Sequence, residues 1–296
     1  SRPCINGKFV IGEDYPEPGL SNMKRMMKLM LALVATFFFF FGLLSQSTGD
    51  FRSNNAAMTW TTAAQWQTWN GSSWVAAGTY PGQSASGAAV LIQDGHTVTL
   101  DVSPANTLGS LTVGSGASGV LIIGNSATNR TLTVTGNVAV AVGGTLRSGA
   151  NSATGHVLNI GGSLTNNGTV NLFFSTDVCT AVFTGASPVV SGSGATFTFR
   201  NLTRSTSGTS ITVSNSIRVE GTLDLAVNSG TMIVGTNANL TMGQNAVFAA
   251  TGGTLGSNGR YVQLDGLTGA NSNLIKVSAG TTASWQITYP IGTSNG

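Results

Sequence analysis

Charged residues are scarce in this chain. Asp, Glu, Lys and Arg together make up 8% of the 296 residues, whereas an ordinary soluble domain has roughly 25%. From residue 48 onward there are eight basic and seven acidic residues, and they form no run of one sign. A protein that binds nucleic acid needs a basic patch or stripe. The sequence therefore predicts that nucleic acid is not a partner.

Cysteine is almost absent. The two cysteines are Cys4 and Cys179, and we expect the first to be lost with an N-terminal leader. One remaining cysteine excludes an internal disulfide, so the fold must be stabilised by packing. We expect Cys179 to be a small buried hydrophobe. The alternative is a reactive thiol, or one that pairs with another molecule.

The first 47 residues have the character of a leader. Residues 1–22 contain three prolines and no periodicity, and we expect upstream or disordered sequence there. Residues 23–47 begin with Met and a basic stretch, continue with sixteen uncharged residues at 29–44 and end in small residues. This pattern predicts a signal peptide cleaved near Ser47 and a secreted or outer-surface protein, which meets the membrane only through this segment before cleavage. The alternative is a retained membrane anchor, because a span needs about 17–25 apolar residues.

Glycine, by contrast, is abundant, and a repeat is present. There are 40 glycines, and Ser, Thr and Asn supply much of the polarity, as is typical of short strands joined by tight turns. The segment at 132–140 (LTVTGNVAV) returns at 158–164 (LNIGGSL) and at 211–219 (ITVSNSIRV). The first two copies start 26 residues apart and the third starts 53 later, close to two periods, so we expect a degraded copy at 181–190.

Each copy holds two apolar runs that alternate with period two, and a third run follows at 144–146, 168–172 and 221–225. This alternation places Val134 on the inner face and Thr133 on the outer face of extended backbone. A coil of three short strands has no second layer to cover its apolar inside, so it must stack on neighbouring coils. The prediction is an all-β chain that folds as a right-handed parallel β-helix, a solenoid with three short strands per coil and an N-terminal cap.

The composition predicts five segments along the chain. They are a leader at 1–22, a signal peptide at 23–47, a cap with the first coils at 48–103, β-helix repeats at 104–259, and a C-terminal cap or truncated further β domain at 260–296. Asparagines at recurrent turns, such as Asn137 and Asn215, are expected to adopt left-handed backbone or to stack in a ladder between coils.

Four tryptophans crowd into the predicted cap. They are Trp60, Trp66, Trp69 and Trp74. The first coil of a β-helix exposes the end of its apolar core, so bulky side chains are needed to cover it. We therefore expect the tryptophans to act as a cap. The alternative is a platform on which sugar rings stack, which makes these four residues the candidate carbohydrate contacts.

A resemblance starts at the same tryptophans. The motifs are WNG at 69–71, PG at 81–82, VLIQDGHTVTLD at 90–101 and LGSLTV at 108–113. The region 60–113 resembles the N-terminal part of large secreted repeat proteins of the Bacteroidota and is similar to the extracellular β domain named for its eight glycines. The resemblance implies a β-helical, adhesin-like surface protein exported by a type IX pathway with a C-terminal sorting domain. No sorting domain is recognised here, so we expect the chain to be truncated.

Two groupings of residues and one histidine have side chains or spacing that could serve a chemical site. The glycine pattern at 114–119 is followed by a strand rather than the helix that a dinucleotide site requires, so no cofactor is expected. Asp94, His96 and Asp101 read as a turn residue and exposed strand residues rather than as metal ligands. His156 reads as an ordinary polar turn residue.

The acids of the repeat region argue against catalysis. Glycosidases use a pair of carboxylates, and here Glu220 and Asp224, with Arg218, are expected to form a solvated surface trio, while Asp177 stands apart. We expect a monomeric, secreted or cell-surface structural or adhesive protein that is not an enzyme and has no cofactor or metal. Its expected partner is a surface polysaccharide or other extracellular glycan. The alternative is a non-catalytic carbohydrate-binding or accessory region of a larger polysaccharide-active enzyme.

Overall fold

The computed structural model describes residues 46–124, 126–206, 210–226, 231–255, 260–265, 273–277 and 291–292. These residues belong to one compact unit, Gln46–Gly296. The predicted leader lies outside the described residues, as does the predicted signal peptide except for Gln46 and Ser47. Within the described ranges, no helix has the length and apolar character required to span a bilayer.

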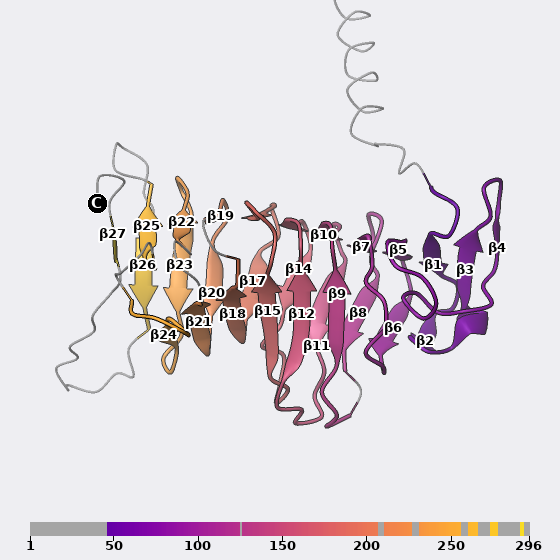
Figure 1. Cartoon of the computed structure of the whole chain (residues 1–296), viewed down its shortest axis with the longest axis horizontal. Helices are drawn as coiled ribbons and strands as arrows, with labels where there is room; N and C mark the ends of the chain where they lie inside the picture. The colour runs from indigo at the N-terminus through magenta and orange to yellow at the C-terminus, as the bar shows by residue number, and fades with distance from the viewer. Residues whose placement is uncertain are drawn as a thin grey trace, which may run out of the picture. The chain divides into compact units, whose positions relative to one another are not determined.

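The described residues form three sheets, which we call A, B and C (Figure 1). Sheet A contains, in spatial order, β4 (Trp74–Ala76), β3 (Trp66–Trp69), β1 (Phe51–Ser53), β5 (Ala89–Ile92), β7 (Ser110–Val113), β10 (Val138–Val140), β13 (Leu164–Asn166), β16 (Val189–Ser191), β19 (Ile211–Val213), β22 (Met232–Val234), β25 (Val262–Leu264) and β27 (Ile291–Gly292).

Sheet B contains β2 (Ala57–Thr59), β6 (Thr97–Leu100), β8 (Val120–Ile123), β11 (Thr145–Ser148), β14 (Thr169–Asn171), β17 (Thr196–Phe199), β20 (Ile217–Val219), β23 (Asn239–Met242) and β26 (Asn273–Lys276). Sheet C contains β9 (Thr131–Val134), β12 (His156–Ile160), β15 (Cys179–Phe183), β18 (Asn201–Arg204), β21 (Thr222–Leu225) and β24 (Val247–Ala249). A single turn of 3-10 helix, Ala63–Gln65, precedes β3.

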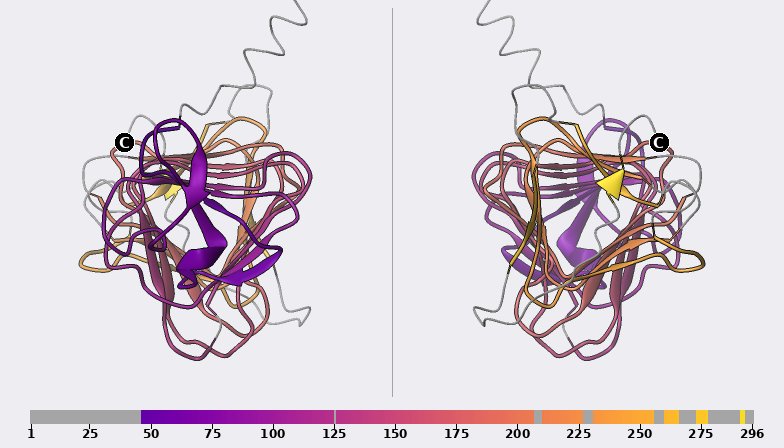
Figure 2. Two further views of the ribbon diagram at one scale, coloured as in Figure 1. Left: turned by 90° about the vertical axis from the view of Figure 1, so that its right-hand side faces the viewer. Right: turned by 90° about the vertical axis from the view of Figure 1, so that its left-hand side faces the viewer.

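The chain visits the sheets in the order A, B, C and then returns to A. Six complete turns of this kind run from β7 to β24, and the strands of successive turns pair in parallel, as β12 does with β9 and with β15. Seen end on, the turns superimpose into a closed coil (Figure 2). The predicted parallel β-helix with three strands per coil is therefore confirmed.

The core is one continuous column of apolar side chains inside the coil. Along β9 the residues alternate between half-buried and buried, with Thr133 outside and Val134 fully inside. Inward residues stack turn on turn: in sheet C, the series is Leu132, Leu158, Ala181, Leu202 and Leu223, all buried. Each turn therefore completes the apolar surface of the next, as a stacked repeat requires.

The predicted phase of the repeat is wrong after residue 190. The copies at 132–140 and 158–164 lie on sheets C and A, and the copy at 181–190 does so too, because Ala181 pairs with Leu158. The copy at 211–219 instead lies on β19 and β20, in sheets A and B. The connection from sheet B to sheet C shortens from seven residues, 172–178, to the single residue Arg200. Fifty-three residues therefore carry the chain to a different side of the coil.

A hairpin closes the N-terminal end of the coil. Strands β3 and β4 are antiparallel to each other, and β3 pairs with β1. The indigo N-terminal segment crosses the end of the coil in the left view of Figure 2. Trp60 and Trp66 are completely buried there, with ring centroids 5.0 Å apart. Both indole N–H groups donate to backbone carbonyls, Trp66 to Trp60 and Trp60 to Pro81, so this pair acts as an end cap.

Two expectations about single residues have different outcomes. Cys179 is fully buried, as predicted, and burial together with the nearby charge of Asp177 raises the pKa of its thiol to about 12. The prediction for His156 is wrong. It is the first residue of β12 and is fully buried, because its ring lies against Gly124 of the preceding turn, where no side chain occupies the space.

Candidate functional site

The outer face of the N-terminal hairpin carries an aromatic surface. Strand alternation points Trp66 into the core and Trp69 outward, and the register sets Trp69 opposite Trp74 and Arg52 opposite Gln67. The Trp69 and Trp74 rings are 5.5 Å apart at 61°, and the Arg52 guanidinium carbon lies 4.6 Å from the Trp74 ring centroid. We call the four outward residues, Arg52, Gln67, Trp69 and Trp74, the hairpin platform.

The hairpin platform is held rigidly at its base. The Arg52 Nε donates a 2.7 Å hydrogen bond to Gln67 Oε1, so the guanidinium is fixed beside the Trp74 ring. Both outward tryptophans are half-buried, and each leaves part of its ring in contact with solvent. The parts of these indoles that reach solvent, together with the adjacent guanidinium, offer apolar contact to the C–H groups of a sugar and donors to its hydroxyl groups.

The four tryptophans thus divide into two pairs. Trp60 and Trp66 have no exposed surface and cannot touch a ligand, whereas Trp69 and Trp74 can. Sequence position alone places all four within fifteen residues. Strand β3 begins at Trp66. Once that start is known, the alternation of side chains along the strand places Trp66 inward and Trp69 outward.

A second concave surface lies where sheet B meets sheet C. Connections from B to C are seven residues long in three successive turns, 124–130, 149–155 and 172–178, then fall to one and two residues, Arg200 and 220–221, and return to four at 243–246. The long connections project from the lower side of the coil in Figure 1, in the magenta to pink part of the chain. The tight corners form the floor of a hollow between two raised loops.

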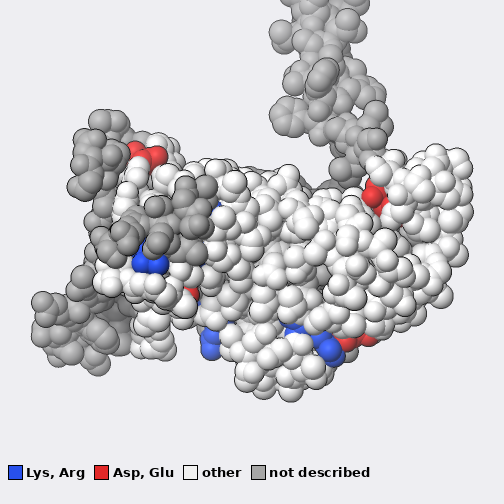
Figure 3. Space-filling model, in the orientation of Figure 1, with Lys and Arg blue, Asp and Glu red and all other residues white. Residues whose placement is uncertain are grey.

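This hollow has a volume of about 560 Å³, and we call it the corner groove. Its lining residues are Phe173, Val178, Arg200, Asn201, Arg218, Glu220, Gly221, Gln244, Asn245 and Val277. The Arg200 guanidinium carbon lies 4.9 Å from the Phe173 ring centroid. Figure 3 shows how sparse charge is on the face drawn there, where several of the blue side chains lie along the lower edge.

The predicted trio of Arg218, Glu220 and Asp224 is only partly brought together. Arg218 Nε is hydrogen-bonded to Glu220 Oε1 on the floor of the corner groove. Asp224 turns away, and its carboxylate accepts hydrogen bonds from the backbone N–H and the hydroxyl of Thr251 in the next turn, at 2.9 and 2.6 Å. The two carboxylates therefore do not form a pair that flanks one substrate bond.

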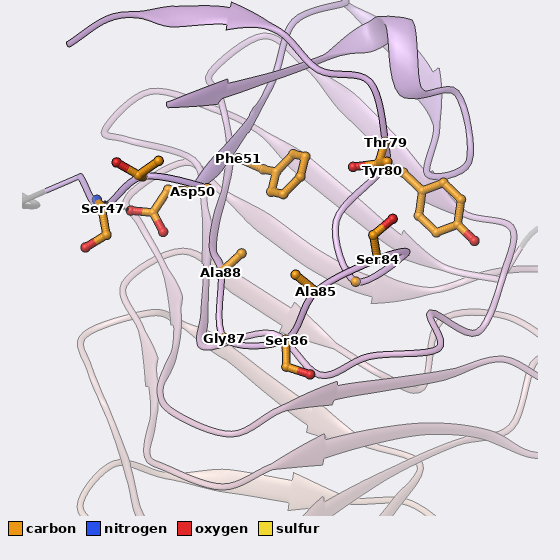
Figure 4. Close-up of a pocket in the computed structure, with 13 residues that line it drawn as sticks. Ser47, Asp50, Phe51, Thr79, Tyr80, Ser84, Ala85, Ser86, Gly87 and Ala88 are labelled. Atoms are coloured by element: carbon orange, nitrogen blue, oxygen red, sulfur yellow. Dashed lines mark hydrogen bonds between the residues drawn. The ribbon is translucent and has the colours of Figure 1, made fainter. Parts of the chain in front are cut away.

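A smaller hollow lies beside the cap. It measures about 210 Å³, and Figure 4 shows Phe51, Tyr80 and the small residues of 84–88 around it. Asp50 is its carboxylate, but Oδ2 accepts a 2.6 Å bond from the Ser47 N–H and Oδ1 a 2.9 Å bond from the Ala89 N–H. These bonds join the beginning of the described chain to β5, so the acid has a structural role.

The residues considered as metal ligands each have a partner elsewhere. His96 Nδ1 is 2.8 Å from the Ser53 hydroxyl, and Asp101 accepts bonds from the N–H and hydroxyl of Thr61. Asp94 accepts bonds from the glycine-patterned loop at 114–119. Within the described segments, no three His, Cys, Asp or Glu side chains gather as metal ligands would.

The glycine-patterned loop therefore binds an anion, but that anion is Asp94 of the preceding turn. The Ser115 N–H and hydroxyl lie 2.8 and 2.6 Å from its oxygens, and the Ser118 N–H lies at 3.0 Å. Partial burial raises the pKa of Asp94, but these bonds, with one from the Ala117 N–H, lower it to about 2. The amides that could hold a phosphate are occupied by the protein itself.

The remaining chemically notable cluster is sealed in the core. His156 Nδ1 accepts a 2.9 Å bond from the Arg130 N–H, so the ring proton is on Nε2, which lies 3.3 Å from Asp177 Oδ2. Asp177 also accepts bonds from two backbone amides, and Cys179 pairs in register with His156. The three side chains are at most 1% exposed, and Cys179 is held as a thiol, so the cluster cannot meet a substrate.

Comparison with known proteins yields no relative. No family model matches the chain, and no curated protein and no solved structure is significantly similar to it. The fold and the two surfaces described above are therefore the evidence on which its function is argued.

Proposed function

We propose that this chain is a secreted or cell-surface β-helix with a structural and adhesive role, and that it holds an extracellular glycan at the hairpin platform. The observation that carries the proposal is the outward Trp69 and Trp74 pair beside Arg52, at the end of a long coil whose other tryptophans in the cap are buried. A rigid coil that carries a binding surface at one end has the form of an adhesin stalk.

The use of the carboxylates supports a non-catalytic role. Asp50, Asp94, Asp101, Asp177 and Asp224 all accept hydrogen bonds from backbone amides. Glu220 is bonded to Arg218. A glycosidase needs two carboxyl groups that flank one bond, and Glu220 is the one acid among the described residues that line the corner groove. We therefore propose that the chain has no hydrolase or lyase activity of its own.

Secretion belongs to the same proposal. It rests on the basic and apolar pattern of residues 23–47 and on the resemblance to type IX-exported surface proteins of the Bacteroidota at 60–113. We propose that cleavage near Ser47 releases a monomeric chain to the outer surface, and that membrane contact ends with cleavage. Pulse-labelling of cells that express the chain tests this, since an uncleaved product retained in the inner membrane would contradict it.

Binding of neutral oligosaccharides tests the glycan site. Cellohexaose, xylohexaose and chitohexaose are titrated into the chain while tryptophan fluorescence is followed. We expect one of them to shift the emission, and we expect Trp74→Ala to weaken that binding at least about tenfold, as loss of a stacked ring does at other interfaces. Val75→Ala is the matched control, because it lies on the same strand and points to the opposite face. Equal binding by both variants would refute the platform.

The alternative function, an accessory region of a larger polysaccharide-active enzyme, uses the same platform. It predicts that the gene continues past residue 296 into a catalytic domain, whereas the adhesive reading predicts further Gly/Thr/Asn repeats and a sorting domain. A polysaccharide screen of the chain adds a second test. Turnover that is abolished by Glu220→Gln or Asp224→Asn would overturn the non-catalytic proposal.

A further inference from the structure

We propose that the corner groove is a second binding site and that its ligand is an acidic sugar, a glycan unit with one carboxylate or sulfate among hydroxyl groups. This inference concerns a different surface from the hairpin platform and does not depend on it. The groove lies on the side of the coil, at the corners around β17 and β20, whereas the platform lies on β1, β3 and β4.

The cation that would bind the anion is Arg200. Its guanidinium is stacked on Phe173, which fixes the orientation of the planar group. Among the described residues, Arg200 forms no ion pair, whereas the Arg218 charge in the same groove is offset by Glu220. An orientated guanidinium can bind a carboxylate or sulfate through two parallel N–H bonds. Arg200 thus offers the groove a positive charge that no described carboxylate offsets.

The rest of the groove suits hydroxyl groups rather than further anions. Glu220 can accept a hydrogen bond from a hydroxyl group but repels a second oxyanion, and it is held in place between Arg218 and Gly243, where a larger residue would collide with it. Gln244 and Asn245 are exposed on the opposite loop, and their amides can both donate and accept. One anion beside several hydroxyls is the pattern of a uronic acid or a sulfated sugar.

Two other classes of polymer fit this surface poorly. Nucleic acid binds through several phosphate contacts at once, whereas among the described residues that line the groove Arg200 is the single cation without an ion pair, and a carboxylate lies in the same groove. A peptide that adds as a strand needs free main-chain partners on the surface that it joins, and one that binds through its acidic side chains needs a cluster of arginines. On the groove floor the N–H groups of Glu220, Gly221 and Thr222 are already donated to Phe199, Arg200 and Asn201. The observations therefore favour a saccharide.

Calorimetric titration of the full chain tests the site with defined probes. Trigalacturonate carries ring carboxylates, its methyl ester has the same rings without charge, and sulfated maltotriose carries sulfate instead. Inorganic sulfate reports on a bare anion. We expect trigalacturonate or sulfated maltotriose to bind and the methyl ester to bind at least about tenfold more weakly, because a charge-assisted hydrogen bond is lost. The stronger of the two acidic probes identifies the source of the oxyanion.

Variants locate the binding within the molecule. Arg200→Gln is expected to weaken binding of the acidic probe at least about tenfold. Phe173→Leu should weaken it several-fold, because the Arg200 guanidinium loses the ring on which it is stacked. Arg147→Gln is the matched control: Arg147 stacks on Phe174 at 4.2 Å in the same manner but lies outside the groove. Trp74→Ala should leave this affinity unchanged, which separates the groove from the hairpin platform.

Several results would overturn the inference. These are no binding of either acidic probe, equal affinity for the methyl ester, an equal loss in Arg147→Gln and Arg200→Gln, or tighter binding of polyglutamate or single-stranded DNA. If Arg200→Gln lowers the melting temperature, Arg200→Lys is used instead. It keeps the charge but loses the bidentate geometry, and unchanged affinity in a folded Arg200→Lys would exclude the stacked guanidinium as the binding group.

Discussion

At the scale of single residues, short polar side chains join each turn to the next. Asn137 Oδ1 accepts a 2.8 Å bond from the Ser163 N–H, and Asn215 Nδ2 donates a 2.7 Å bond to the Gly192 carbonyl. Neither asparagine has a positive φ, so the predicted left-handed backbone is wrong for both, and each contacts the neighbouring coil through its backbone rather than through a ladder of stacked asparagines. Each such bond contributes about 0.5–1.5 kcal/mol to stability, and Asp94 contributes through the same kind of contact.

The Asp94 contact predicts a pH dependence. Its pKa in the folded chain is about 2, below the ordinary 3.8, so its stabilising effect is complete above pH 3.8 and is lost as the pH falls through about 2. Asp94→Asn removes the titration. Urea unfolding at pH 5, 3 and 2 should therefore show that the free energy of unfolding falls more steeply with decreasing pH in the parent chain than in the variant. Parallel curves would contradict the role given to the carboxylate.

The His156 pocket predicts a cost for one methyl group. A Cβ at Gly124, which has a φ of 91°, would collide with the His156 ring. We expect Gly124→Ala to lower the free energy of unfolding by about 2–4 kcal/mol through strain and overpacking. Gly95→Ala is the control, because its φ is 76° and nothing lies near its Cβ; it should cost only about 1–2 kcal/mol. Equal losses of unfolding free energy in the two variants would mean that the His156 ring can move aside at little cost.

At the scale of the strand, the inner and outer faces are decided by alternation. Val134 and Thr133 are neighbours on β9, yet the first is fully buried and the second is half-exposed and accepts a 3.0 Å bond from Asn159 Nδ2. Since every inward residue stacks on the turns before and after it, a defect at one position affects more than its own strand. The hydroxyl of Thr133 meets only a polar neighbour on the next strand.

Matched substitutions on β9 test this assignment. Val134→Asp would bury a carboxylate among aliphatic side chains, and we expect it to cost several kcal/mol unless the group takes up a proton. Thr133→Asp should cost less than about 1 kcal/mol, because the new carboxylate can accept the same bond from Asn159 and is otherwise in water. Thermal melts followed by circular dichroism measure both, and similar midpoints would show that the faces are misassigned.

At the scale of the whole molecule, the coil needs an end that water cannot enter. The buried pair of Trp60 and Trp66 fills the last position of the apolar column, and Phe51 lies edge-on to Trp66 at 6.5 Å. The antiparallel hairpin also extends sheet A beyond β1, so that the sheet ends here in the three-residue strand β4, and an edge strand this short offers little to pair with another chain. The buried side chains of the cap and the proposed glycan contact thus lie on opposite faces of the same hairpin.

Replacement of one tryptophan from each face separates the two roles. We expect Trp66→Ala to cost about 3–5 kcal/mol, because a large buried ring leaves a cavity. Trp74→Ala should cost under about 1 kcal/mol while it removes the outward ring of the platform. Chemical denaturation and acrylamide quenching of both variants give the comparison. A Trp66→Ala chain as stable as the parent would argue against the cap.

Much of the architecture follows from the sequence by itself. Period-two alternation identifies Val134 as inward and Thr133 as outward, and a three-strand coil without a second layer has to stack. The aromatic cap is a local feature too, but the prediction that all four tryptophans form it is only half correct, because Trp60 and Trp66 are buried and Trp69 and Trp74 point outward. The buried state of Cys179 also follows, since a small apolar residue at an alternating position belongs to the core.

The tertiary structure alone decided which turns align and which side chains meet. The connection from sheet B to sheet C varies from seven residues to one. No local sequence pattern indicates that length, so the sheets on which the copy at 211–219 lies could not be predicted. Phe173, Arg200 and Arg218 come together only because β14, β17 and β20 pair in register. Likewise His156 is buried because the preceding turn has a glycine at 124. Local alternation sets the face of a residue, whereas its neighbours depend on loop lengths summed over a whole turn.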